Sequence, residues 1–181
     1  MISIRLEDPK GAPLPAACPG QYVALRVQPD KRQRAVRRNY SLSGPSATGF
    51  YGVTIKREHD RVASGYLHTR LAVGDKLDVA APRGTFILDG THAPVLLISA
   101  GIGATPVLAM LQALAQEHSD REIWWLHAGR NSQEHSLAAE ARALLALLPN
   151  VRTHVYYSRP GPNDLADSSD SKTATSTARA V

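Results

Sequence analysis

The 181-residue sequence predicts an all-β antiparallel barrel of six strands with one short helix, followed by a partial α/β domain with a parallel sheet. Two observations predict this fold class. In the first half of the chain, apolar and polar residues alternate with the period of two that is typical of half-buried strands. Beyond Pro94, the strand candidates become continuous apolar runs and the segments between them acquire helical periodicity. We therefore expect the barrel at residues 1–90, the α/β domain at 91–160, and a disordered tail at 161–181, which has too few apolar residues to form a core.

The barrel is predicted from short alternating segments that are separated by turn-rich sequence such as "DPKGAPLPAACPG" and "GPSATG". The strand candidates are 2–7, 21–28, 38–43, 51–58, 75–82 and 84–88. Between the fourth and fifth of them, residues 63–72 predict the short helix, with Ser64 as its N-cap. Several short antiparallel strands in about 90 residues indicate a small barrel or sandwich.

The second part reads as β-α-β-α-β. The strand candidates are "VLLIS" (95–99), "EIWWLHA" (122–128) and "VRTHVYY" (151–157), and the first is expected to be buried on both faces. A helix is predicted after Thr105, which can act as N-cap, with Pro106 as the first helical residue. A second helix is predicted from the leucines and alanines of 137–148. This order predicts a parallel sheet with right-handed crossovers.

The composition narrows the class of protein. The formal net charge is +5, and basic residues concentrate in "KRQRAVRR" (31–38). No aromatic residue interleaves this run and no nucleic-acid-binding motif surrounds it, so we expect either a solvated loop or a site for a phosphate or an acidic partner. No apolar run approaches the roughly 20 residues of a membrane span, and no secretory signal is evident. With one cysteine, Cys18, the expectation is a cytoplasmic protein with no membrane or nucleic-acid partner.

The stretch "AGIGATP" (100–106) indicates a ligand site. Two glycines between a buried strand and a helix let a phosphate approach the backbone, and the N–H groups of the helix start carry partial positive charge. A tight strand-to-helix turn without a ligand is the alternative. After the second strand, "HAGRN" offers Arg130 and no acidic residue, which favours a 2′-phosphate and therefore NADPH over NADH.

Four motifs, in order, resemble the ferredoxin–NADP reductase superfamily, and most of all the reductase part of flavohaemoglobins. "RNYS" (38–41) matches the R-x-Y-S flavin motif, and "ASGYLH" (63–68) resembles the second flavin-binding stretch. "PRGTF" (82–86) resembles the segment that closes the barrel, and "AGIGATP" resembles the nucleotide loop. The resemblance covers about residues 2–160.

The resemblance implies FAD as cofactor and NAD(P)H as electron donor. The implied activity passes a hydride from NAD(P)H to FAD and then electrons to a haem protein or another one-electron acceptor. It implies that residues 1–90 bind FAD and that 91–160 form a partial NAD(P)-binding domain. The globin domain and the later segments of the family are not matched, so we expect FAD binding to survive better than nicotinamide turnover. No metal site is predicted, and the oligomeric state is left open.

The same resemblance assigns individual roles. Arg38 would pair with the flavin phosphate, Tyr40 would pack against the isoalloxazine, and Ser41 would lie near flavin N5. Ser41 and Thr105 would be the catalytic residues, with Thr105 beside the nicotinamide. The full set of expected cofactor-binding residues is Arg38, Asn39, Tyr40, Ser41, Ala63, Ser64, His68, Gly101, Gly103, Ala104, Thr105, Pro106 and Arg130.

Other interpretations remain open. The chain is alternatively a flavin-binding fragment with little nicotinamide turnover, or the reductase component of an iron–sulfur oxygenase system. Tyr40 on its own fits a half-buried core residue, and Ser64 fits a simple helix cap. The rings of His68 and His127 are expected to be structural, and Trp124 and Trp125 are expected to pack on opposite faces of their strand.

Overall fold

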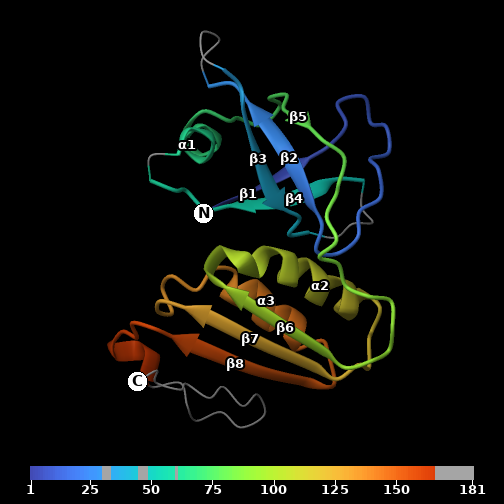
Figure 1. The fold of residues 1–181 in the computed structure, drawn as a ribbon, viewed down its shortest axis with the longest axis vertical. Coiled ribbons are helices and arrows are strands. Elements are labelled where there is room, and N and C mark those ends of the chain that lie inside the picture. Colours follow the sequence, from blue (N-terminus) through green and yellow to red (C-terminus); the bar gives the residue numbers. More distant parts are fainter. Residues whose placement is uncertain (30–33, 45–48, 60, 166–181) are drawn as a thin grey trace. The chain divides into compact units, whose positions relative to one another are not determined.

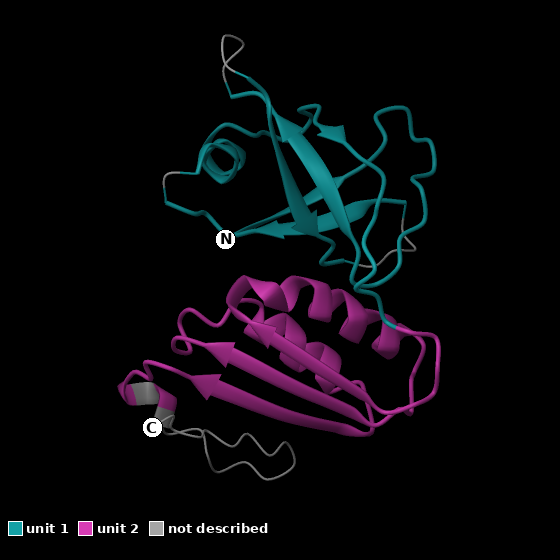
Figure 2. Ribbon diagram, in the orientation of Figure 1, with its two compact units in different colours: residues 1–88 teal, residues 89–181 magenta. Residues whose placement is uncertain are grey.

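The computed structural model describes residues 1–29, 34–44, 49–59 and 61–165. The chain divides into two compact units, residues 1–88 and 89–181 (Figure 2). An antiparallel β unit is followed by a unit with a parallel sheet and helices, as predicted (Figure 1). None of the helices in the described ranges combines the length and the apolar character needed to cross a membrane.

The first unit is built from two small antiparallel sheets. Strand β1 (Ile2–Leu6) pairs with β4 (Tyr51–Ile55). Strand β2 (Tyr22–Val27) lies between β3 (Val36–Ser41) and β5 (Asp78–Val79). A bridge between Leu42 and Val53 and the backbone hydrogen bond from Ser43 N to Gly52 O connect the end of β3 to β4. The two sheets therefore curve into a partly closed barrel around one core.

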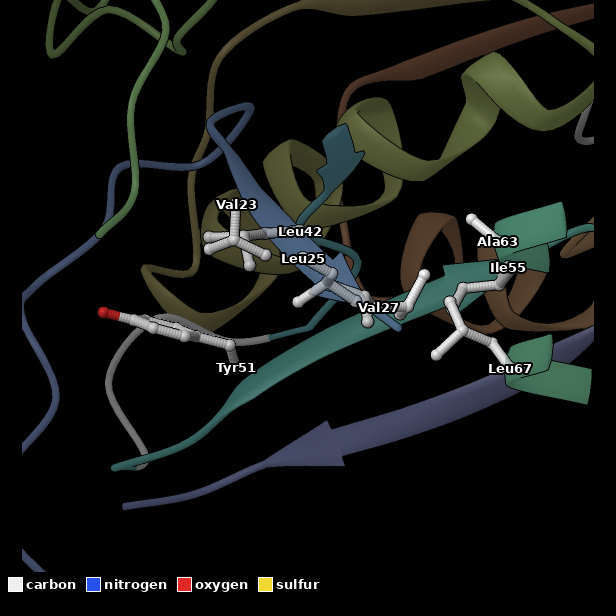
Figure 3. Packing of buried hydrophobic residues seen from close by; sticks show 9 residues of the cluster. Val23, Leu25, Val27, Leu42, Tyr51, Ile55, Ala63 and Leu67 are labelled. Atoms are coloured by element: carbon white, nitrogen blue, oxygen red, sulfur yellow. The ribbon is translucent and has the colours of Figure 1, made fainter. Parts of the chain in front are cut away.

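Side chains from both sheets and from helix α1 (Val62–Thr69) form this core (Figure 3). The alternation of β2 turns Val23, Leu25 and Val27 inward, and β4 contributes Val53 and Ile55. The cluster consists of Val23, Leu25, Val27, Leu42, Tyr51, Val53, Ile55, Ala63 and Leu67. Burying each large aliphatic side chain stabilises the unit by about 1.5–3 kcal/mol before conformational entropy is subtracted.

Two strand predictions in this unit are wrong. Residues 84–88 form no strand, because Gly84 adopts φ +116° and turns the chain after the single bridge between Arg83 and Tyr22. Strand β5 covers two residues instead of 75–82, since Asp75 is held in a turn in which its carboxylate accepts from Ala72 N. The barrel therefore has five strands among the described residues, not six.

The second unit is a parallel sheet in the order β6-β7-β8. Its elements are β6 (Val95–Ala100), the 3₁₀ turn η1 (Gly101–Gly103), α2 (Ala104–Gln116), β7 (Ile123–Gly129), α3 (Ala138–Leu145), β8 (Val151–Tyr157) and the 3₁₀ turn η2 (Pro162–Leu165). When successive strands are neighbours, two right-handed crossovers place both helices on one face. Helix α2 accordingly packs on β6 and contacts α3 (Figure 1).

One face of this sheet is buried and the other is exposed. Leu97 is 4% exposed, whereas Leu96 and Ile98 on the opposite face are 58% and 66% exposed. The expectation that 95–99 is buried on both faces is therefore wrong, because no described element covers the second face. Trp124 and Trp125 do lie on opposite faces, as predicted: Trp125 is buried, and Trp124 stacks on His154.

The predicted disordered tail differs at its start. The carboxylate of Asp164 accepts from Gly161 N at 2.7 Å and from Ser132 N at 3.3 Å, which ties residues 161–165 to the loop after β7. Hydrogen bonding to Ser132 first, and then to Gly161 N, holds the pKa of Asp164 below its usual value. Residues 166–181, the rest of the predicted tail, lie outside the described residues.

Candidate functional site

The R-x-Y-S motif lies on β3, where the alternation of a strand separates its side chains onto two faces. Arg38 and Tyr40 are two residues apart and share a face, opposite Leu25 and Val23 of β2. Tyr40 packs against the core cluster and is half-buried, which agrees with its reading as a core residue. Burial raises the pKa of the Tyr40 hydroxyl, and the positive charge of Arg38 partly opposes this rise.

Arg38 is exposed, and its guanidinium Nη1 donates to the carbonyl of Arg37 at 2.7 Å. A guanidinium has five N–H donors in a fixed fork, so one backbone contact leaves most of them available for an anion. Asn39 and Ser41 lie on the other face of β3, and Ser41 is opposite Tyr22. Lys31, Arg32 and Gln33 of the basic run lie outside the described residues.

Helix α1 places Ser64 inside its first turn, so the prediction of Ser64 as N-cap is wrong. The helix begins at Val62 with Arg61 as N-cap. The buried Ser64 hydroxyl accepts from Glu58 N at 3.2 Å and donates to Arg61 O at 3.4 Å. The serine therefore links the preceding chain to the first turn of the helix.

Two further residues of the second flavin stretch have defined surroundings. Ala63 is buried in the core cluster. The half-buried His68 forms a hydrogen bond through Nε2 with the carbonyl of Ile55 at 3.0 Å, which ties α1 to β4. Contacts of these side chains with a flavin remain a prediction, and backbone N–H groups of the first helical turn are the available donors.

The glycine loop lies directly after β6. Gly101 adopts φ +49°, a left-handed conformation that favours glycine. A Cβ atom added at Gly101 or Gly103 would meet no atom within 4 Å, so the backbone here is open to approach. The 13-residue helix α2 starts at Ala104 with no side-chain cap. The Ala104 N–H donates to Gly101 O and Ile102 O, and Pro106 has no N–H, so Thr105 is the one residue among the first three of the helix that can offer its N–H to an anion.

The predicted helix start is wrong by two residues. Gly103, not Thr105, is the N-cap, and Pro106 is the third helical residue. Thr105 is buried, and its hydroxyl donates to Ile102 O at 3.0 Å, so towards a ligand it can act only as an acceptor. Ala104 is also buried. Proline is tolerated here because the first-turn N–H groups have no partner within a helix.

Charged residues gather where β7 and β8 end. Arg130 Nη1 lies 3.3 Å from Glu134 Oε2, an acid that sequence reasoning missed because it follows the strand by five residues. The backbone of Arg159 donates to Arg130 O at 2.8 Å, which places a second arginine beside the first. Arg159 lies two residues after the end of β8, and that position at the carboxyl edge of a parallel sheet was the available signal.

The residues present therefore suit FAD and a nicotinamide dinucleotide. An exposed arginine and a first helical turn are available for phosphates in the first unit. In the second unit, the open backbone at Gly101 and Gly103 gives a pyrophosphate access to the loop and to the Thr105 N–H at the start of α2. The described residues contain no cluster of three or more His, Cys, Asp or Glu side chains suited to a metal ion.

Comparisons with known proteins give the same pair of ligands. Residues 5–87 match the oxidoreductase FAD-binding domain, and residues 97–176 match the oxidoreductase NAD-binding domain. The flavohemoprotein of Deinococcus radiodurans is 41% identical over 164 residues, which are 91% of this chain and 41% of that protein. The flavohemoprotein of Pseudomonas aeruginosa is 42% identical over 168 residues, or 92% of this chain and 42% of that protein. The chain thus spans less than half the length of these relatives.

Solved structures agree with the sequence matches. The flavohem-like FAD/NAD-binding domain of nitric oxide dioxygenase from Vibrio cholerae superimposes with a TM-score of 0.83 at 34% identity, covering 90% of this chain and 70% of that one. The cytochrome b5 reductase domain of Ulva prolifera nitrate reductase shares the fold, with a TM-score of 0.74 at 22% identity over 88% of this chain and 69% of that one. These findings confirm the resemblance drawn from the four motifs. The chain belongs to the FAD-dependent NAD(P)H oxidoreductase domains of the flavohaemoprotein type, within the ferredoxin–NADP reductase superfamily.

Proposed function

We propose that this chain is an electron-transfer module that receives a hydride from NAD(P)H on FAD and passes electrons on to a haem protein. The observation that carries the proposal is the exposed, unobstructed Gly103 backbone at the uncapped start of α2. Residues 1–90 are the FAD-binding part and residues 91–160 are the NAD(P)-binding part. We place the module in the cytoplasm.

On the flavin side, the chain positions the cofactor. FAD, when bound, supplies the hydride and one-electron chemistry, while the protein supplies binding and orientation. The Arg38 guanidinium binds a phosphate of FAD. Tyr40, which packs against the core cluster, also packs against the isoalloxazine ring. Ser41 provides a hydroxyl near flavin N5. The other groups proposed to bind FAD are the side chains of Asn39 and His68 and the first-turn amides of Ala63 and Ser64.

On the nicotinamide side, Gly101 and Gly103 admit the pyrophosphate to the start of α2. Ala104 and Pro106 define the first turn of that helix, and Thr105 accepts a hydrogen bond beside the nicotinamide while its own proton stays on Ile102 O. Holding the two reacting groups in contact geometry lowers the barrier by avoiding most of the entropic cost of bringing them together.

The relatives are flavohemoproteins, and this similarity supports the choice of acceptor. We propose a haem as the one-electron acceptor. Arg34 and Arg37 are exposed beside the flavin motif and would attract an acidic partner surface. Such attraction weakens as salt rises.

The test uses the full chain reconstituted with FAD. We expect a yellow protein whose flavin absorbance bleaches when NADPH or NADH is added without oxygen, and recovers when a haem acceptor such as ferric cytochrome c is added. A yellow protein that no nicotinamide bleaches contradicts the reductase function and leaves a flavin-binding fragment. A protein that cannot take up FAD contradicts both.

Nucleotide preference provides a second prediction. We expect Glu134→Gln to raise the preference for NADPH over NADH by about 3- to 10-fold, because it releases Arg130 from its ion pair for the 2′-phosphate, and exposed charge pairs of this kind are worth roughly 1 kcal/mol. Arg130→Gln should shift the ratio of kcat/KM values by a similar factor towards NADH. Glu140→Gln, at an exposed position on α3, is the matched control. An unchanged ratio in both Arg130→Gln and Glu134→Gln would remove Arg130 from the site.

A further inference from the structure

Beneath the carboxyl end of the parallel sheet, five side chains from four chain segments form one polar cluster. Ser99 of β6 accepts from Trp125 Nε1 of β7 at 2.9 Å and lies 2.9 Å from His127 Nδ1. His127 is 1% exposed, and its ring stacks on that of His135 with centroids 4.3 Å apart and planes 9° apart. His135 Nδ1 in turn lies 2.9 Å from the hydroxyl of Tyr157 at the end of β8.

The surroundings of the stacked pair favour the neutral form of both imidazole rings. The Nε2 atoms of both His127 and His135 are buried without a hydrogen-bond partner among the described residues. A proton added to either ring would create a buried positive charge that no carboxylate of the described residues pairs with, and two charged rings at this separation would repel. Among the described residues, Tyr157 contacts His135, and the charges that act against a cation on the pair are the partner ring and Arg142 of α3.

Each member of the cluster stands next to a loop of the proposed nucleotide site. Ser99 lies two residues before Gly101, and His127 lies three residues before Arg130. His135 directly follows Glu134, the ion-pair partner of Arg130, and Tyr157 precedes the segment that donates to Arg130 O. Through the contacts of His127 with Ser99 and of His135 with Tyr157, the stacked pair therefore connects the 129–137 loop to strands β6, β7 and β8.

We propose that the stacked His127–His135 pair is a positioning element for NAD(P)H, which holds the 129–137 loop in its binding conformation while both rings are neutral and releases it when either ring is protonated. The consequence for binding rests on the proposed function, whereas the loop opening does not. At acidic pH the module would thus lose its hold on the nucleotide while the flavin unit keeps its cofactor.

The direction of the pH effect follows from burial. Burial, reinforced by His135, lowers the pKa of His127 from 6.5 to about 4, and burial with Arg142 lowers that of His135. An open loop exposes rings with the ordinary value near 6.5, so the closed form is fully favoured above that pH. Its advantage is lost progressively as the pH falls from about 6.5 towards 4.

The decisive measurement is amide hydrogen exchange without nucleotide, at pH 7.5 and 5.0, corrected for the intrinsic pH dependence of exchange. We expect protection of the 129–137 amides to fall at least tenfold at the lower pH, with the α2 amides unchanged. His135→Phe keeps an aromatic ring on His127 but removes one of the two titrating groups, so it should weaken this dependence and leave the part that comes from His127. His154→Phe, on the opposite face of the sheet against Trp124, is the matched control and should behave like the wild type. Loop protection that does not change with pH in the wild type overturns the proposal.

Nucleotide affinity is then measured on the FAD-loaded chain over the same pH range. The dissociation constant for NAD(P)H should rise at least tenfold from pH 7.5 to 5.0 in the wild type and by a smaller factor in His135→Phe. If the chain binds no nucleotide at any pH, the proposed function fails, and the exchange result alone decides the inference. If His135→Phe does not fold, NMR titration of the wild-type histidine ring protons replaces it. Ring titration near pH 6.5 with the loop still protected would contradict the proposal.

Discussion

Replacing Gly103 with valine is expected to lower NAD(P)H affinity at least tenfold and to leave the stability of the protein almost unchanged. Gly103 has φ −63°, which any residue adopts, and a Cβ placed there meets no atom within 4 Å. Exposed substitutions of this kind usually change the free energy of unfolding by less than about 0.5 kcal/mol. A branched side chain would nevertheless stand between an approaching pyrophosphate and the Thr105 N–H at the start of α2.

The measurement compares urea unfolding with the rate and extent of flavin bleaching by NAD(P)H. Gly90→Val is the control, because Gly90 is also exposed and also leaves open space around an added Cβ. Gly101 is unsuitable for this experiment, since its φ of +49° would strain any larger residue and confuse folding with binding. If Gly103→Val binds nucleotide normally, the dinucleotide does not approach the backbone at this loop.

Arg38→Ala is expected to weaken FAD binding by about 10- to 100-fold, since charge-assisted hydrogen bonds to a phosphate are worth about 1.5–3 kcal/mol each. The side chain is exposed and donates only to the neighbouring carbonyl of Arg37 in the described structure. Its removal should therefore cost the fold little. The half-buried Tyr40 would keep its place on the core.

The neighbouring Arg37 supplies a control of equal charge. It is exposed on the same strand but lies on the opposite face, so Arg37→Ala should retain FAD within about threefold, the effect of a general change in charge. Retention of FAD is followed by the recovery of flavin fluorescence during dilution. Equal losses in the two variants would show that net charge, not a contact of Arg38, governs flavin affinity.

The sequence was informative where one local signal dominates. Alternation located the central barrel strands, and the change of periodicity after Pro94 separated the β part from the α/β part. It failed at 84–88, where the apolar residues are part of a turned segment that starts at Gly84. Phe86 and Ile87 are 59% and 45% exposed there, so their hydrophobicity did not report burial.

The helix starts and the polar cluster were harder to predict, because a polar residue near a helix start does not by itself fix the N-cap position and the cluster depends on contacts between distant segments. Ser64 and Thr105 are polar residues near a helix start, but the backbone places them inside the first turn, where their hydroxyls donate to Arg61 O and Ile102 O. The His127–His135 stack joins residues from a strand and a loop, and no spacing rule predicts that two such rings meet. Glu134 was missed because it lies in the same loop, five residues after the end of β7.

Because Trp124 and Trp125 face opposite sides of the sheet, their fluorescence reports on two different environments. These are the only tryptophans of the chain. The indole of Trp125 lies among Ser99, His127 and His135, whereas that of Trp124 contacts His154 and the guanidinium of Arg152, both on β8. A Trp124→Phe protein would thus emit only from the buried polar cluster, and a Trp125→Phe protein only from the exposed face. The chain carries an internal fluorescent reporter for each side of its parallel sheet.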